Sequence, residues 1–171
     1  WLNEGVQNTD AFLSLCKQRI NDQFVQTWNN EIMKSTRADS YRLFADFGFK
    51  VYLKHVTLTK LIQDLTRLRV SSHRLQIETG RWHKPRKIPR HERKCIVCNS
   101  LEDEFHLLLE CSLFRDLREK HINPYYWKYP NIVKFTELLK TDNVMVLKQL
   151  AVYVHKCFQR RNEYYYLNDK S

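Results

Sequence analysis

Three cysteines and one histidine lie within one short segment of this chain and have the chemistry to bind a metal ion. They are Cys95, Cys98, His106 and Cys111, in the segment CIVCNSLEDEFHLLLEC, with the spacing C-x2-C-x7-H-x4-C. Three thiolates and one imidazole complete the tetrahedral ligand set of zinc and leave no position for water or substrate. The pattern therefore predicts one structural Zn²⁺ and favours a structural site over a catalytic one.

The spacing of these residues also predicts how the chain around them is arranged. A C-x2-C turn can present two sulfurs to one ion at about 2.3 Å, and His106 and Cys111 are close enough for one or two helical turns to present both. We expect the intervening leucines to face the core and shield the site, and the acidic run at 102–104 to form surface ion pairs with the basic segment before it. Metal removal is expected to unfold at least residues 90–120.

A strongly basic segment directly precedes the metal motif. Residues 81–94, RWHKPRKIPRHERK, contain seven Lys or Arg residues against one acid, with a tryptophan among them. Cations interleaved with an aromatic ring suit a phosphate backbone and a base that stacks on the ring, although many charge runs are only solvated surface. The residues expected to contact nucleic acid are Arg67, Arg69, Arg74, Arg81, Trp82, Lys84, Arg86, Lys87, Arg90, Arg93 and Lys94.

Composition narrows the class of protein. The chain has 29 Lys and Arg against 19 Asp and Glu, a net charge of +10, which favours a polyanionic partner. No apolar run reaches membrane-spanning length, so no membrane partner is expected. Five cysteines, three of them in the metal motif, indicate a reducing compartment, the nucleus or the cytoplasm. The motifs of phosphate-cradling loops, serine hydrolases and metalloproteases are missing, so we do not expect an enzyme.

The predicted elements are almost all helices. Three glycines and four prolines leave little material for tight hairpins. Apolar periodicity predicts helices over 8–34, 57–72, 112–120 and 130–139, and a long one that Thr141 or Asp142 caps, while 40–49 fits a helix or a strand. The expected fold class is mainly α, a small helical domain with an inserted CCHC zinc-knuckle-like loop. Residues 1–80 would form an N-terminal helical part, 81–120 the basic connector and metal motif, and 121–171 helices that pack back into one compact domain.

Several stretches resemble a known family. LTRLRVSSHRLQIETGRW, ERKCIVCN and LEDEFHLLLECSLFRDLR resemble the zinc-binding CCHC region near the C-terminus of non-LTR retrotransposon reverse transcriptase proteins, and YRLFADFGFKVYL resembles its lead-in. The similarity covers about residues 41–118, and the four metal-ligand positions match one for one. It implies an accessory region that helps a reverse transcriptase engage RNA or DNA. Polymerase and endonuclease chemistry would then lie outside this chain. Either the chain is a fragment of such a polyprotein, or a host gene kept this tail and lost the catalytic parts.

Two functions from different classes follow. The first is a zinc-stabilised, non-catalytic nucleic-acid-binding accessory domain of a mobile-element protein, which contacts RNA or DNA through the basic segment. The alternative is a zinc-scaffolded protein–protein interaction or oligomerisation module, in which the apolar stripe of the first helix pairs with another chain. A catalytic function would require a metal site with an open position.

Overall fold

The chain packs into two units in the computed structural model, which describes residues 8–168. The first unit is Trp1–Ala38 and the second Asp39–Ser171. The first contains one helix, α1 (Thr9–Lys34), in which the Asn8 side chain accepts a hydrogen bond from the Ala11 N–H at 3.0 Å. This contact satisfies an N–H group that the first helical turn leaves without a partner. The helix predicted over 8–34 is confirmed.

The second unit is also helical, and all three segments expected from the sequence contribute residues to it. Apart from one isolated bridge between Lys94 and Leu101, the described residues contain no β-structure. The predicted class, mainly α, is therefore confirmed. Its helices are α2 (Tyr52–His55), α3 (Thr59–Arg69), α4 (Gln76–Thr79), α5 (Arg115–His121), α6 (Pro124–Trp127), α7 (Ile132–Lys140) and α8 (Val144–Asn168). Shorter turns are the 3-10 segments Tyr41–Leu43, Arg90–Glu92 and Ser112–Phe114 and the π-helical turn His106–Glu110.

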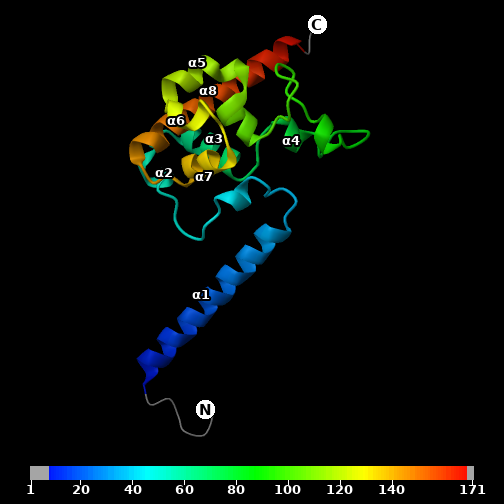
Figure 1. The fold of residues 1–171 in the computed structure, drawn as a ribbon. Helices are drawn as coiled ribbons and strands as arrows, with labels where there is room; N and C mark the ends of the chain where they lie inside the picture. The colour runs from blue at the N-terminus through cyan, green and yellow to red at the C-terminus, as the bar shows by residue number, and fades with distance from the viewer. Residues whose placement is uncertain (1–7, 169–171) are drawn as a thin grey trace. The chain divides into compact units, whose positions relative to one another are not determined.

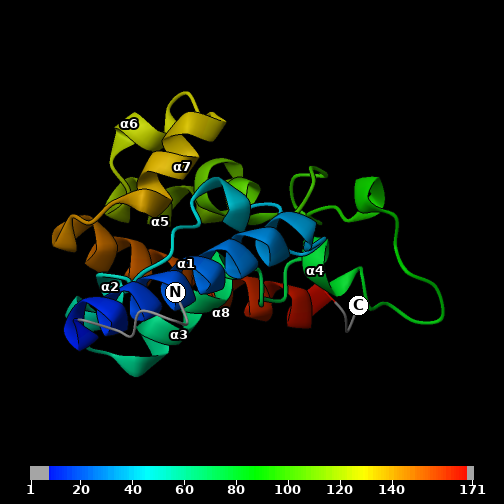
Figure 2. The same cartoon turned by 90° about the horizontal axis from the view of Figure 1, so that it is seen from below.

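Helix α8 is the element on which the second unit is assembled. It packs against α2, α3 and α5, as Figures 1 and 2 show from two directions. Its inward residues Leu147, Leu150 and Val154 are buried, as their spacing predicts. The helix begins slightly later than expected, because Asn143 accepts hydrogen bonds from the N–H groups of Met145 (3.0 Å) and Val146 (3.2 Å). Asn143, and not Thr141 or Asp142, is therefore the cap.

The basic connector between α4 and the metal motif forms a closed loop that projects outward from the helices in both views (Figures 1 and 2). The loop closes where the Ile88 N–H donates to the Gly80 carbonyl at 2.9 Å. Arg93 braces its base by donating to the carbonyls of Ile77 and Ile88, both at 2.9 Å. A Cβ atom on Gly80 would lie 2.8 Å from Cγ of Arg93, so only glycine allows this close approach.

Candidate metal centre

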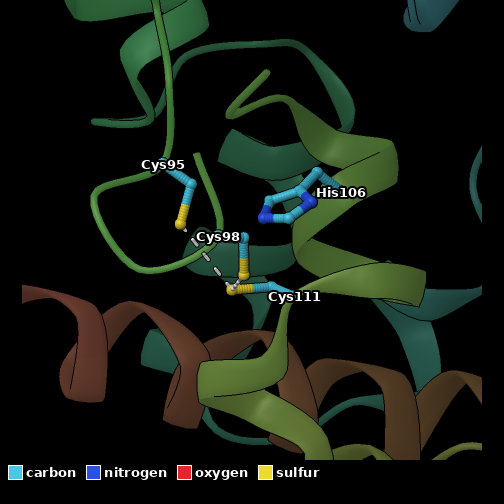
Figure 3. A group of neighbouring side chains, drawn as sticks. All are labelled: Cys95, Cys98, His106 and Cys111. Carbon is cyan, nitrogen blue, oxygen red and sulfur yellow. Dashed lines mark hydrogen bonds between the residues drawn. The ribbon is translucent and has the colours of Figure 1, made fainter. Parts of the chain in front are cut away.

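The four predicted ligands converge in space. One ligand atom from each of Cys95, Cys98, His106 and Cys111 lies within 4.8 Å of the others. The Sγ atom of Cys111 is 3.9 Å from that of Cys95 and 3.8 Å from that of Cys98 (Figure 3). Sulfurs bound at about 2.3 Å to one tetrahedral ion lie about 3.8 Å apart. The sulfur positions therefore fit a single metal ion held by all four residues.

The imidazole of His106 supports this interpretation independently of the sulfurs. Its Nε2 atom is buried and has no hydrogen-bond partner among the described residues, while the ring points toward the three thiols (Figure 3). A buried ring nitrogen without a partner is destabilising unless something else satisfies it, and a coordinated cation would do so. On the other side of the ring, Nδ1 lies 3.4 Å from Oε2 of Glu110. A carboxylate behind a ligating imidazole is the common arrangement in metal sites, so Nε2 is the expected ligand atom.

A tight turn positions the first two cysteines. The Cys95 N–H donates to the Ser100 carbonyl and the Asn99 N–H donates to the Cys95 carbonyl, both at 2.8 Å. Asn99 has a φ of 55°, in the left-handed region that asparagine tolerates better than most residues. The Cys98 sulfur lies 3.4 Å from the Ser112 N–H and 3.2 Å from its hydroxyl. Both contacts favour the thiolate form of Cys98.

A π-helical turn brings the other two ligands together. In an α-helix, residues five positions apart differ by about 140° around the axis and face different directions. Here the Cys111 N–H donates to the His106 carbonyl at 2.8 Å, which closes a wider turn across five residues. This single turn places His106 and Cys111 on the same side of the chain. It explains how a spacing of H-x4-C serves one ion.

Side chains from two later helices hold this turn. Arg118 of α5 donates from Nε to the Leu108 carbonyl (2.9 Å) and from Nη2 to the Cys111 carbonyl (2.7 Å). The Tyr153 hydroxyl of α8 lies 3.0 Å from the Leu107 carbonyl. The leucines at 107–109 are buried, so the prediction that they face the core is confirmed. Arg118 and Tyr153 were not predicted from the sequence, although a polar residue on an otherwise apolar helix stripe is a signal that could have indicated them.

The acidic run beside the site differs from its prediction. Glu102 and Glu104 are buried and do not form surface pairs with the connector. Glu102 accepts two hydrogen bonds from Arg161 of α8, from Nε at 2.8 Å and from Nη2 at 2.7 Å. Glu104 accepts from the Ser71 hydroxyl at 2.6 Å and lies 2.8 Å from His73 Nε2. For these two carboxylates the prediction of surface ion pairs was wrong, because they lie between α8 and the turn after α3, where they anchor the metal segment.

The electrostatics of the four residues favour the thiolate at Cys95 and Cys98 but the protonated forms of Cys111 and His106. The hydrogen bond from Cys111 lowers the pKa of the Cys95 thiol to about 3, although burial opposes this change, and the same contact raises the pKa of Cys111. Burial lowers the pKa of His106, but the neighbouring Cys95 thiolate, then Cys98 and then Glu110 outweigh it and raise that pKa to about 9. A bound dication would replace the imidazolium proton as the counter-charge and favour the thiolate at all three cysteines.

Most of the predicted nucleic-acid contacts lie on the surface. The exposed residues are Arg67, Arg74, Trp82, Lys84, Arg86, Lys87, Arg90 and Lys94, and Arg81 and Arg93 are half-buried. Trp82 is 64% exposed, yet its indole N–H donates to Glu78 Oε1 at 3.1 Å, so the ring is both fixed and accessible. Burial and then the charges of Arg81 and Arg90 lower the pKa of Arg93, which shows that the loop brings these three cations together.

Arg69 is the exception among these residues. It is only 5% exposed and lies between the rings of Phe44 and Tyr52, with its Cζ atom 5.0 and 5.3 Å from their centroids. Its Nη1 donates to the Leu139 carbonyl at the end of α7. Arg69 is therefore not part of the exposed basic surface.

Comparison of the chain with known protein families, curated proteins and solved structures finds no match. Within residues 8–168, no helix is both long enough and apolar enough to cross a membrane. What the chain does must be inferred from the geometry of its own residues.

Proposed function

We propose that this chain is a zinc-stabilised, non-catalytic accessory domain that binds nucleic acid within a retrotransposon-like protein. The observation that carries the proposal is the closed Cys3His cluster, joined without a break to an exposed loop of cations around a fixed tryptophan. Neither feature alone identifies a nucleic-acid ligand. Together, the metal cluster supplies a rigid support and the loop supplies cations beside an aromatic ring.

Zinc is the metal that suits these ligands. Thiolates and imidazole in a tetrahedral arrangement favour Zn²⁺ over the oxygen-seeking Mg²⁺ and Ca²⁺. The thiolates of Cys95, Cys98 and Cys111 and the Nε2 atom of His106 would hold it. A bound zinc supplies folding free energy to the segment between the connector and α5. All four ligands come from the protein, so nothing in this set activates a water molecule.

The connector is the proposed binding surface. Its closure between Gly80 and Ile88 leaves Lys84, Arg86 and Lys87 exposed at the outer part of the loop. These cations would contact phosphates, and the Trp82 ring would stack on a base. Both RNA and DNA offer these groups, so the proposal covers either polymer.

The family resemblance supports the same proposal. The four ligand positions match the CCHC pattern of non-LTR retrotransposon proteins, and the similar stretches include the connector's first residues. By this resemblance the partner beyond nucleic acid is the rest of a reverse transcriptase protein, in the nucleus or the cytoplasm. The alternative, a zinc-scaffolded protein-interaction module, stays a prediction from the sequence.

Salt-dependent binding tests the proposal. Fluorescence anisotropy of labelled RNA and duplex DNA should give affinities that fall steeply with salt, because each phosphate contact adds about 0.7–0.9 to the slope of log K against log salt. The triple variant Lys84→Ala, Arg86→Ala, Lys87→Ala should lower this slope by about 2–3.

A matched triple variant controls for net charge. Lys120→Ala, Lys128→Ala and Lys148→Ala remove the same charge from exposed positions outside the connector. This control should leave the slope nearly unchanged. An equal loss of slope in both triple variants, or no binding by the parent protein at low salt, would contradict the proposal.

A further inference from the structure

A second candidate site lies away from the metal centre. A pocket of about 290 Å³ opens between the segment after the Tyr41–Leu43 turn, the end of α3 and the junction of α7 with α8. None of the metal ligands or connector residues lines it. Its walls combine the rings of Phe44 and Tyr52 with the charged side chains of Lys50, Arg69 and Asp142. The pocket is therefore both apolar and charged, as small-ligand sites commonly are.

Arg69 is the unusual residue of this pocket. It is almost fully buried, yet in the part of the chain that the structure describes it forms no ion pair with a carboxylate. Its single hydrogen bond goes from Nη1 to the Leu139 carbonyl, while a guanidinium has five N–H donors. The two aromatic faces and the negative end of α7 offset only part of its charge. The guanidinium nitrogens that make no hydrogen bond are not among the fully buried polar atoms, so they are open to an anion that enters the pocket.

The other charges around the pocket leave a positive excess. Lys50, Arg69 and Lys140 line it together with Asp46 and Asp142, three cations against two acids. Lys50 is paired with Asp46. Burial and then the Arg69 charge lower the pKa of Lys50. The two cations therefore repel each other in the pocket. An anion entering beside Arg69 would relieve that repulsion.

We propose that the Arg69 pocket binds a phosphate group, either inorganic phosphate or the terminal group of a phosphate monoester. The planar guanidinium fork matches two phosphate oxygens, and Lys140 adds a point charge at the rim. The volume exceeds what one phosphate needs, so a small group attached to it also fits. The exposed ring of Phe49, which lines the same pocket, could contact that group. The site does not depend on the connector binding nucleic acid.

Titration of the metal-loaded full chain tests this proposal. Backbone amide NMR shifts are followed at constant ionic strength while inorganic phosphate, a nucleoside 5′-monophosphate or the nucleoside alone is added. Saturable shifts at Phe49, Lys50 and Asp142 with both phosphate compounds, and none with the nucleoside, are expected. Tighter binding of the monophosphate would assign the ester as the ligand, and equal affinities would assign phosphate itself. No saturable shift at the pocket with either compound would overturn the proposal.

Two exposed positions keep the test independent of folding, since Arg69 variants lose core contacts. Asp142→Asn removes a repelling charge and should tighten phosphate binding about three-fold, while Lys140→Gln should weaken it by a similar factor. Lys120→Gln makes the same charge change on α5, outside the pocket, and should have no effect. Equal weakening by Lys120→Gln and Lys140→Gln would mean that phosphate only responds to net charge, and the site would be rejected.

Discussion

The two ring nitrogens of His106 have different roles. Nε2 is buried without a hydrogen-bond partner and faces the sulfurs, whereas Nδ1 faces the Glu110 carboxylate. If Nδ1 carries the proton and donates it to Glu110, the lone pair of Nε2 is directed to the metal. One carboxylate thereby fixes both the orientation and the tautomer of the ligand.

Replacement of Glu110 tests this assignment. Glu110→Ala should keep all four ligands but weaken metal binding about ten-fold or more, because the imidazole loses the group that orients it. Competition with a chromogenic chelator measures the affinity. Glu119→Ala removes an exposed acid of α5 and is the matched control. If both variants bind metal as the parent does, Nδ1 has no such role.

Between elements, a buried ion pair joins Glu102 of the metal segment to Arg161 of α8. Both side chains are less than a tenth exposed, and two hydrogen bonds join them. Tyr165 adds its hydroxyl at 3.1 Å to the same carboxylate, and the Arg161 guanidinium lies 4.0 Å from the Tyr165 ring. The pair ties the loop between Cys98 and His106 to the end of α8.

Two adjacent arginines of α8 allow a direct comparison. Arg161→Met should cost about 3–5 kcal/mol of unfolding free energy, because it leaves the Glu102 charge buried and unpaired. Arg160→Met breaks a pair with the exposed Asp116 and a hydrogen bond to the Leu113 carbonyl, and should cost only about 1–2 kcal/mol. Urea unfolding of the metal-loaded variants measures both values. Adding Glu102→Gln to Arg161→Met should recover part of the loss, and equal costs for the two arginines would refute the assignment.

The sequence predicted the features that depend on residues close together in the chain. The bounds of α1 follow from apolar periodicity and from Asn8, and the metal ligands follow from their spacing. The burial of Glu102 and the role of Arg161 depend on residues 59 positions apart. The π-helical turn is held in part by Tyr153, which lies 46 positions from Leu107. Such pairings leave no periodic signal. Arg69 shows the same limit, since on the sequence it resembles any cation of an exposed helix face.

At the scale of the whole second unit, the metal segment belongs to the core. Leu107, Leu108 and Leu109 join the buried residues of α3, α7 and α8 in one cluster. These leucines lie in the π-helical turn between the two ligands His106 and Cys111. Loss of the ion should therefore affect more than the loop that holds it.

Chelation followed by hydrogen exchange tests this dependence. Removing the metal should abolish amide protection at least across residues 90–120, because structural metal binding contributes directly to the free energy of folding. Adding zinc back should restore the protection. The same chelator presaturated with zinc is the control. Protection that persists in this segment after complete metal removal would show that the core holds without the ion.

The most direct test of the central claim is X-ray absorption spectroscopy of the zinc-loaded protein. A closed Cys3His site predicts three sulfurs at about 2.3 Å and one nitrogen at about 2.0–2.1 Å around each zinc, with no oxygen ligand. This result would establish a structural centre that supports the connector. A site with fewer sulfurs and a bound water oxygen would contradict that account and indicate an open coordination position, as catalytic zinc sites have.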